Sequence, residues 1–264
     1  MLQVGLGPHA QGCRRLDELT MRDYAAILGQ DRPLAVLQPV GSVEPHGPHL
    51  PLGTDTMISV AAAERAARRL DEAGVGVLVA PAIPFGVTDF ASGFPGAVSV
   101  PADALTAFLR AIVVAHQSAG ALHVCLINNH LEPAQDAAVR AAISDLAPGS
   151  ASVACPLTRR WARTLSAEFK SGACHAGRYE SSLVLAARPE LVSEEARASL
   201  AEVPISLSDG IRDGKSTFQE MGMNDAYAGA PAAATADEGE EQLDLLATMI
   251  VTEVTEGLAK RESA

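Results

Sequence analysis

Short apolar runs alternate along the chain with longer stretches in which apolar residues recur every three or four positions. The apolar runs predict buried strands at residues 33–40, 75–80, 122–127 and 152–155. The periodic stretches predict helices at residues 57–72, 103–118, 133–146, 159–169, 179–187 and 238–258. Strands and helices in this order are typical of β-α-β units, so we predict an α/β fold with a mostly parallel central sheet.

Residues 204–236 break this alternation. They are rich in Gly, Asp, Pro and Ala and show no helical or strand period, which indicates a long excursion near the functional site or at an oligomer contact. Asp103 is the expected N-cap of its helix. The length of 264 residues and the lack of an internal repeat favour one domain over residues 1–264.

The charge balance excludes two classes of partner. The chain has 20 Lys and Arg against 32 Asp and Glu, a formal net charge of −12. Nucleic acids are bound by neutralising phosphates with basic residues, and anionic membranes attract positive charge, so we expect neither as a partner. A cytoplasmic location is the simplest expectation, because there is no apolar run of roughly 18 residues, residues 1–17 contain no signal-peptide core, and the four cysteines are scattered.

The first group of candidate site residues directly follows the first predicted strand. The segment GSVEPHGPHLPLGTD at residues 41–55 supplies the potential ligands Glu44, His46, His49 and Asp55. Carboxylate oxygen together with imidazole nitrogen suits zinc, manganese or iron better than calcium. Open α/β sheets build their sites at the carboxyl ends of strands, so this position favours a metal site over a solvated surface loop.

Two later segments repeat this chemistry. The segment NNHLEP at residues 128–133 follows another very apolar strand and carries His130 and Glu132 at the same i, i+2 spacing as the first pair. The segment CHAGRYESS at residues 174–182 adds His175 and Glu180 at the start of a predicted helix. An acid or base there could act beside a metal-bound water.

These segments together resemble the creatininase (creatinine amidohydrolase) family, which includes creatininase, a formamide hydrolase and the peptidase of mycofactocin maturation. The family motif Gly-Ser-x-Glu-x-His-Gly-Pro-His-Leu-Pro-Leu-x-Thr-Asp matches residues 41–55, and Phe-Pro-Gly matches residues 94–96. The family's His-Ala-Gly-x-x-Glu-Thr-Ser resembles residues 175–182, and its late Gly-x-Pro and Ala-Thr resemble residues 229–235. The resemblance therefore covers nearly the whole chain.

The resemblance implies a three-layer α/β/α fold, a binuclear metal site with zinc, manganese or iron, and assembly as a hexamer. It implies that Glu44, Asp55 and His130 hold one ion, and that His46, Asp55 and a further carboxylate hold the other. Asp55 would bridge the two ions together with a shared hydroxide, the nucleophile. The further carboxylate is Glu132 or Glu180, and the one that is not a ligand would move protons.

Departures from the family bear on the substrate. Creatininase has tryptophans just before the third motif, whereas residues 170–173 of this chain (KSGA) contain no aromatic residue, so we do not expect creatinine as the substrate. The segment around Phe90 is more apolar than in many relatives, and Asn129 replaces a common glycine. The candidate substrate contacts are Asn129, Leu131, Phe90 and Cys174.

The sequence therefore predicts a divalent-metal-dependent hydrolase acting on a C–N bond of a small amide, formamide or lactam, with His175 and either Glu132 or Glu180 carrying the proton to the leaving nitrogen. Three alternatives remain open. The same site could trim a short or modified peptide, as in the mycofactocin relative. Cys174 and His175 could form a metal-free thiol hydrolase. The fold could also serve as a non-catalytic scaffold.

Overall fold

The computed structural model describes residues 13–263. Residues 1–12, which the single-domain and signal-peptide predictions include, lie outside the described residues. The strands are β1 (Leu34–Val40), β2 (Gly76–Val79), β3 (His123–Asn128) and β4 (Ala151–Ala154). The helices are α1 (Met21–Leu28), α2 (Thr54–Glu72), α3 (Ala102–Ser118), α4 (Pro133–Ala141), α5 (Arg159–Ala162), α6 (Ala167–Ser171), α7 (Arg178–Ala187), α8 (Glu194–Ser199), α9 (Leu207–Arg212), α10 (Phe218–Met221) and α11 (Ala236–Glu262), with 3-10 turns η1 (Leu16–Glu18), η2 (Pro189–Leu191) and η3 (Pro231–Ala233).

The four strands form one parallel sheet in the order β2-β1-β3-β4. The chain leaves β1 toward β2 on one side and later crosses back to place β3 on the other side. The topological switch point therefore lies between β1 and β3, where open α/β sheets form their binding crevice.

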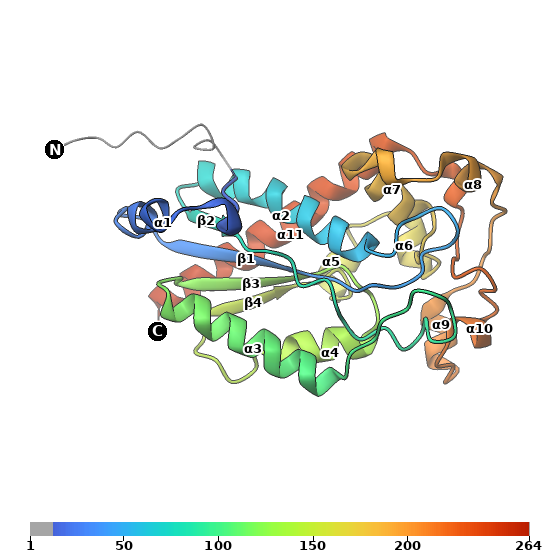
Figure 1. Ribbon diagram of the computed structural model, residues 1–264, viewed down its shortest axis with the longest axis horizontal. Helices are drawn as coiled ribbons and strands as arrows, with labels where there is room; N and C mark the ends of the chain where they lie inside the picture. The colour runs from blue at the N-terminus through green and yellow to red at the C-terminus, as the bar shows by residue number, and fades with distance from the viewer. Residues whose placement is uncertain (1–12, 264) are drawn as a thin grey trace.

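Helices cover both faces of the sheet (Figure 1). α2 and α11 pack on one face, and α3 and α4 pack on the other. Successive strand residues alternate between the two sides: Leu37 and Ile127 join the core under α2 and α11, whereas Val36 and Leu126 join the core under α3 and α4. The predicted three-layer α/β/α architecture is confirmed, and every described strand pair in the sheet is parallel.

Three helix boundaries differ from the sequence prediction. The single helix expected at residues 159–169 is wrong: it divides into α5 and α6, because the Ser166 hydroxyl accepts a hydrogen bond from Phe169 N and starts a new helix. Asp103 is not the N-cap of α3, since the helix begins one residue earlier with Pro101 in the cap position. α2 begins at Thr54 rather than at residue 57, which places Asp55 in its first turn.

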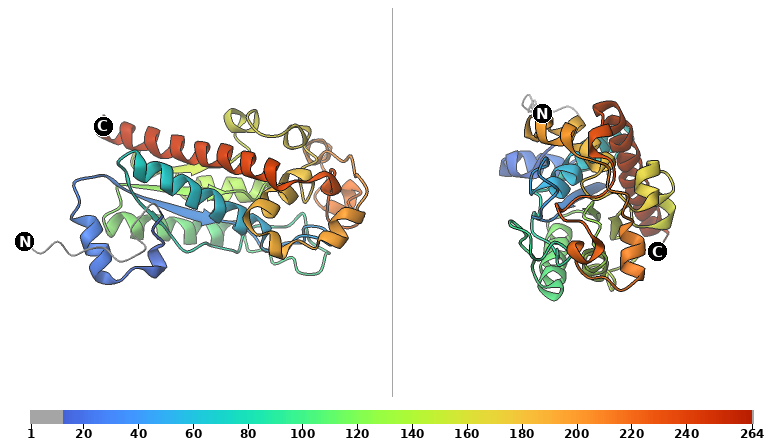
Figure 2. Two further views of the ribbon diagram at one scale, coloured as in Figure 1. Left: turned by 90° about the horizontal axis from the view of Figure 1, so that it is seen from above. Right: turned by 90° about the vertical axis from the view of Figure 1, so that its right-hand side faces the viewer.

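The excursion at residues 204–236 contains α9, α10 and η3 rather than an unstructured loop. α9 and α10 lie at the carboxyl end of the sheet, on the right in Figure 1. α11 runs along the length of the molecule beside α2 (Figure 2). The excursion thus lies near the switch point, as one of the two sequence interpretations expected.

Candidate metal centre

The candidate ligands gather at the carboxyl ends of β1 and β3, on the two sides of the switch point. Three buried groups of side chains have ligand atoms that lie within 4.8 Å of one another. They are Glu44, Asp55 and His130; His46, Asp55 and Glu180; and Glu44, His46 and His175. The groups share members, so they form one continuous cluster.

The loop after β1 and the start of α2 bring the first carboxylates inward. Gly41 lets the first turn of α2 pack against the end of β1, because a Cβ there would lie 2.6 Å from the backbone nitrogen of Thr56. The Ser42 hydroxyl donates to Asp55 Oδ2 at 2.5 Å, and the Thr88 hydroxyl donates to Glu44 Oε2. One hydroxyl thus orients each carboxylate, and Glu44 Oε1 and both oxygens of Asp55 lie against the histidines of the cluster.

His130 is held in one tautomer by the backbone. Its Nε2 lies 2.7 Å from the carbonyl oxygen of Val87, which can only accept, so Nε2 carries the hydrogen. Nδ1 lies 3.1 Å from Glu44 Oε1 and 3.2 Å from Asp55 Oδ2. In the neutral ring, Nδ1 offers a lone pair to the cluster.

His46 repeats this arrangement with the ring nitrogens exchanged. Its Nδ1 donates to the carbonyl oxygen of Glu44 at 3.0 Å. Its Nε2 lies 3.3 Å from Asp55 Oδ1 and 3.6 Å from Glu180 Oε2, and it has no hydrogen-bond partner among residues 13–263. A buried nitrogen without a partner, surrounded by carboxylate oxygens, fits a divalent cation of the zinc, manganese or iron class.

Of the two carboxylates left open by the sequence, Glu180 lies with His46 and Asp55. It comes from the first turn of α7, and its Oε2 also accepts a hydrogen bond from the backbone nitrogen of Ala176 at 2.7 Å. Ala176 has a φ of 51°, in the left-handed region that alanine rarely adopts. This turn between Cys174 and α7 is what directs the Glu180 carboxylate toward the cluster.

Glu132 makes different contacts. Its carboxylate accepts hydrogen bonds from the backbone nitrogens of Asp89 and Phe90, at 3.1 Å and 3.2 Å. Its Oε2 lies 4.0 Å from His130 Nε2, the nitrogen on the far side of that ring from Glu44 and Asp55. Glu132 therefore lies beside the cluster and fixes the segment that carries Phe90.

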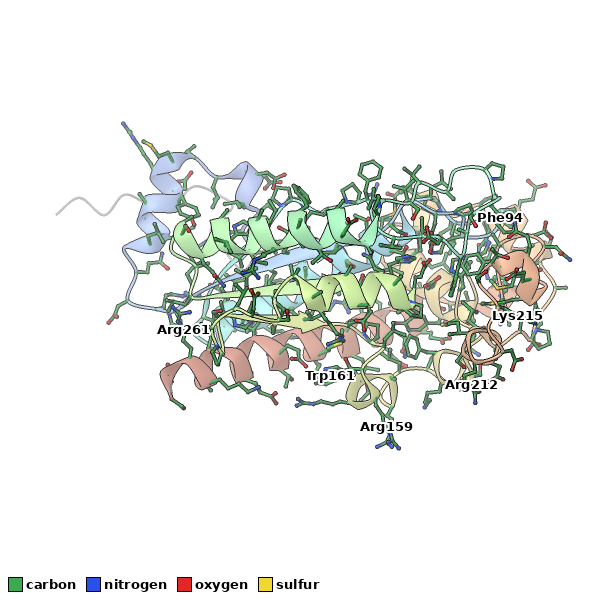
Figure 3. All side chains as sticks on the ribbon, turned by 90° about the horizontal axis from the view of Figure 1, so that it is seen from below. Phe94, Arg159, Trp161, Arg212, Lys215 and Arg261 are labelled. Carbon is green, nitrogen blue, oxygen red and sulfur yellow. The ribbon has the colours of Figure 1, made fainter. Side chains whose placement is uncertain are left out.

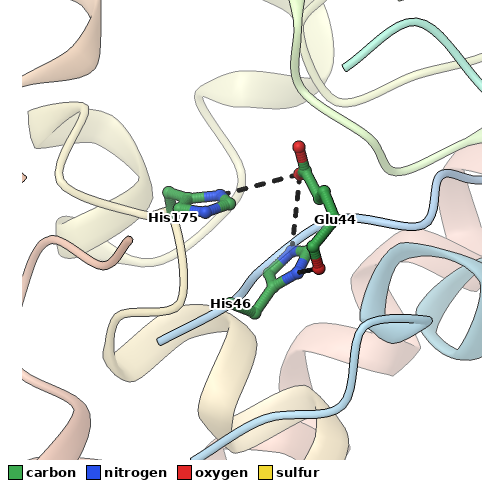
Figure 4. Close-up of side chains that lie close together, drawn as sticks. All are labelled: Glu44, His46 and His175. Carbon is green, nitrogen blue, oxygen red and sulfur yellow. Dashed lines mark hydrogen bonds and ion pairs between the residues drawn. The ribbon is translucent and has the colours of Figure 1, made fainter. Parts of the chain in front are cut away.

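His175 approaches the cluster from the turn before α7 (Figure 4). Its Nε2 donates to the carbonyl oxygen of Pro45 at 3.0 Å, and its Nδ1 lies 3.9 Å from Glu44 Oε1. The ring also lies 4.5 Å from the His46 ring and 4.3 Å from the Phe218 ring, centroid to centroid. The unprotonated Nδ1 thus faces the same space as the carboxylates.

The surroundings set the charge of the histidines in opposite directions. Burial lowers the pKa of His46, but the carboxylates of Asp55, Glu180 and Glu44 outweigh it and raise the pKa to about 10. His130 follows the same pattern, and its pKa lies well above its usual value because Glu44 and Asp55 outweigh burial. Burial and the neighbouring His46 lower the pKa of His175 to about 4, so this ring stays neutral.

Two of the carboxyl groups have raised pKa values. Burial raises the pKa of Glu180 to about 8 and that of Glu132 to about 7. Burial opposes ionisation of Asp55 as well, but the adjacent His46 and His130 hold its pKa well below its usual value. Carboxyl groups near neutral pKa beside a permanently ionised one are suited to exchange protons.

A pocket of about 330 Å³ opens onto the cluster. Its lining includes three of the four predicted substrate contacts, Phe90, Leu131 and Cys174. Asn129 is the exception: its amide nitrogen donates to Ser59 Oγ at 3.1 Å, which ties β3 to α2, and it does not line the pocket. A contact between Asn129 and the substrate stays a prediction.

Sequence reasoning missed several residues of the site. Leu207 and Phe218 come from the excursion and line the pocket, although its composition carried no signal for them. Ser42 and Thr88 orient ligands, and only Ser42 lies within a motif. His49 donates to or accepts from the Ser181 hydroxyl at 2.8 Å and lies outside the three groups of candidate ligands.

Comparisons with known proteins agree with this geometry. The sequence model of the creatininase family, described as creatinine amidohydrolase, matches residues 17–254. The mycofactocin precursor peptide peptidase of Mycobacterium tuberculosis is 33% identical over 215 residues, 78% of each chain, and the creatinine amidohydrolase of Pseudomonas putida is 32% identical over 120 residues, 44% of each chain. A solved structure described as "Creatininase Mn" superposes with a TM-score of 0.70 at 21% identity, covering 93% of this chain and 99% of that one.

Across the described part of the chain, no helix is both long and apolar enough to span a membrane.

Proposed function

Because the chain belongs to the creatininase family, whose members hydrolyse carbon–nitrogen bonds, we propose that it is an amidohydrolase that uses two divalent metal ions per subunit. The ions are zinc, manganese or iron, and the substrate is a small amide, a formamide or a lactam. One observation carries the proposal. Two buried histidines, each tied to a carbonyl by one ring nitrogen, turn the other nitrogen toward three carboxylates.

We assign the ligands from the two groups that share Asp55. Glu44, Asp55 and His130 would hold one ion, and His46, Asp55 and Glu180 would hold the other. Asp55 offers a different oxygen to each histidine, Oδ2 to His130 and Oδ1 to His46, which suits a bridging carboxylate. We choose Glu180 over Glu132 because Glu180 is the carboxylate that lies within reach of His46.

When bound at these residues, such ions would supply a hydroxide nucleophile near neutral pH and would stabilise the oxyanion. His175 is neutral and presents Nδ1 to the pocket, so it can accept a proton there and pass it to the leaving nitrogen. Glu132, with a pKa raised to about 7, is a second group that can hold this proton. The two backbone hydrogen bonds to Glu132 keep its carboxylate fixed at the pocket wall.

The pocket supports an amide other than creatinine. Trp161, the one tryptophan of the chain, lies on α5 with its Nε1 donating to Glu253 at 2.8 Å, and it does not line the pocket. The aromatic residues at the pocket are Phe90 and Phe218 instead. Their rings have no polar atoms, so recognition of a substrate there rests on apolar contact.

A second candidate is a metallopeptidase that trims a short or modified peptide. The mycofactocin precursor peptide peptidases align with most of this chain, whereas the Pseudomonas putida creatinine amidohydrolase aligns with less than half of it. The same ligands and proton carriers would serve a peptide bond. The space beside the pocket then determines how long a substrate the site can bind.

The thiol mechanism is less compatible with the site. Cys174 is buried, and burial together with Glu180 and Glu168 raises the pKa of its thiol above the ordinary value. A nucleophilic cysteine needs the thiolate, so this surrounding is unfavourable. The complete ligand set likewise argues against a non-catalytic scaffold.

Metal content and turnover test the proposal together. Protein purified without chelator or affinity metal should contain about two equivalents of zinc, manganese or iron per subunit by elemental mass spectrometry. Asp55→Ala should hold at most about one equivalent and should lose hydrolysis of a formamide, lactam and short-peptide panel. Cys174→Ser should keep the metal content, and turnover that survives this substitution would exclude the thiol mechanism. A wild-type protein that takes up no metal would overturn the proposal.

We also propose that the chain acts as a single domain in the cytoplasm and assembles as a hexamer. The family resemblance supports the assembly, and the scattered cysteines support a reducing compartment. Neither nucleic acid nor a membrane is proposed as a partner, because the net charge of −12 has the wrong sign for both.

A further inference from the structure

A second groove, of about 830 Å³, adjoins the pocket above the candidate metal centre. The two spaces share Leu131, Cys174 and Leu207 as wall residues. The groove runs on from there between α5, α6 and α9, and it is more than twice as large as the pocket of about 330 Å³. A molecule bound at the ligand cluster can therefore extend into it past these shared residues.

The charged residues of the groove are all positive. Its lining contains Arg159, Arg163 and Lys170 and no acidic residue. Within residues 13–263, eleven of the 20 basic side chains form ion pairs with carboxylates and nine do not, and these three belong to the nine. In a chain where acidic residues outnumber basic ones by 12, unpaired cations that share one groove are unexpected.

The groove also has apolar surface. The groove wall includes Leu157, Ala162, Phe169 and Ile211. Phe169, a residue of α6, is buried, and Leu157 is 39% exposed. Arg159 projects outward at the rim of the molecule (Figure 3), so Arg163 and Lys170 are the cations that we test.

We propose that this groove holds the part of the substrate beyond the scissile amide, and that this part is an acidic peptide segment with apolar side chains next to the centre and a carboxylate farther out. The proposal rests on the second candidate of the proposed function, the metallopeptidase, and narrows its substrate class from a short or modified peptide to an elongated, anionic one. Apolar side chains would lie against Leu131 and Leu207, and the carboxylate would pair with Arg163 and Lys170. These cations also offset the repulsion between an acidic substrate and a protein of net charge −12.

The test uses metal-loaded protein and two sets of hexapeptides of alanine and leucine. In one set a single position is Glu or Gln, and in the other the C-terminus is an acid or a carboxamide. Equilibrium dialysis with mass spectrometry measures intact peptide retained by the protein and peptide cleaved. The two sets distinguish a side-chain carboxylate from a terminal one.

Groove variants and matched controls are compared in the same assay. The groove variants are Arg163→Gln, Lys170→Gln and the double substitution. The controls are Arg68→Gln on α2 and Lys260→Gln on α11, because both side chains are exposed, carry no ion pair in the described part of the chain, and lie outside the groove.

We expect wild type to retain or cleave the peptide with a carboxylate at one position about tenfold better than its neutral counterpart. The double groove variant should lose that preference. Both controls should keep it, and added salt should weaken it in wild type. The proposal would be overturned if wild type retained and cleaved acidic and neutral peptides equally, or if the double variant kept the preference for acidic peptides.

The assay distinguishes a failure of the subsite from a failure of the proposed hydrolysis. Cleavage without any acidic preference would leave the amidohydrolase standing and remove the subsite. Retention of acidic peptides that depends on Arg163 and Lys170, without cleavage, would support the subsite and count against the peptide bond as the bond hydrolysed.

Discussion

Each histidine of the centre is prepared for its role by one backbone carbonyl. The carbonyl oxygens of Glu44, Val87 and Pro45 accept from His46, His130 and His175, and in each ring the opposite nitrogen faces carboxylates. Because the tautomer is fixed by main-chain contacts, no side chain has to move before the ring can accept a cation or a proton. The i, i+2 spacing of Glu44 and His46 indicated only that both side chains could reach one cluster, and it gave no sign of the carbonyl contacts.

The sequence could not choose between Glu132 and Glu180, because both follow a histidine of a motif at short spacing. The choice depends on the path of the chain. Glu132 is engaged by the backbone of Asp89 and Phe90, and Glu180 is directed inward by the turn at Ala176. Neither contact is local enough for a pattern of residue types to indicate it.

The two carboxylates should therefore respond differently to the same substitution. Glu180→Gln should lower the metal content by about one equivalent per subunit, because a ligand is lost. Glu132→Gln should keep both equivalents and lower turnover by roughly 10²-fold or more, because the amide cannot carry a proton. Elemental mass spectrometry and steady-state rates measure the two effects. The reverse result, with Glu132→Gln losing metal, would show that the ligand assignment is wrong.

Metal affinity should rise with pH. Without metal, His46 has a pKa of about 10 and Glu180 a pKa of about 8, so both hold a proton at pH 7. A divalent ion binds their deprotonated forms, so it must displace these protons, and the cost falls as the pH approaches each pKa. Calorimetric titration in two buffers of different ionisation enthalpy should show release of about three protons at pH 7, because the ligand His130, whose pKa is also raised well above its usual value, is protonated as well. Binding without proton release would contradict the assignment of both groups as ligands.

At the scale of elements, the sequence predicted all four strands of the sheet and the main helices that cover it. The strands could be predicted because alternate residues of each strand are buried in the cores on the two sides of the sheet, so nearly every position of a strand is apolar. The prediction failed at short elements. Ser166 ends one helical period and begins another, and α9 and α10 form within a segment that has no period at all.

The start of α2 carries Asp55 and packs against Gly41 at the end of β1. At Gly41 a Cβ would lie 2.3 Å from Thr56 Oγ1, so Gly41→Ala should push the first turn of α2, and with it Asp55, away from β1. We expect a loss of about 1–3 kcal/mol in the free energy of unfolding, together with weaker metal binding. Thermal unfolding and metal titration measure these effects.

Gly53→Ala provides a matched control in the same loop. Its Cβ would lie 3.7 Å from the nearest atom, Met57 Cε, which is ordinary contact. This variant should keep the stability and metal affinity of wild type. Equal losses in both variants would show that the loop tolerates no added carbon anywhere, and that the close approach at Gly41 has no special role.

At the scale of the whole molecule, function is concentrated at one end. The carboxyl ends of β1 and β3 lie on the side of the molecule that carries α9 and α10 (Figure 1). Leu207 of α9 lines both the pocket at the ligand cluster and the adjoining groove. Several large apolar side chains are exposed on other surfaces. Those apolar side chains are where an oligomer contact is most favourable, because burying them removes apolar area from water.

One such surface contains Phe85 and Phe108, which are 48% and 52% exposed. They line an apolar hollow together with Ile83, Val100 and Leu105, on the side of the sheet covered by α3. We predict that wild type has a mass of about six chains by light scattering, and that Phe85→Ser combined with Phe108→Ser yields smaller species. Metal content per chain should not change, because none of these side chains touches a ligand.

Val114→Ser is the control for this last prediction. Val114 is 42% exposed on the same helix, α3, but it lies outside the hollow, so its substitution should leave the mass unchanged. A monomeric wild type would contradict the hexamer. A hexamer that survives the double substitution would show that the contact lies elsewhere. A contact between other surfaces of a chain with a net charge of −12 should then be strengthened by salt, because salt screens the repulsion between acidic residues. The salt dependence of the mass therefore distinguishes an apolar contact from a charged one.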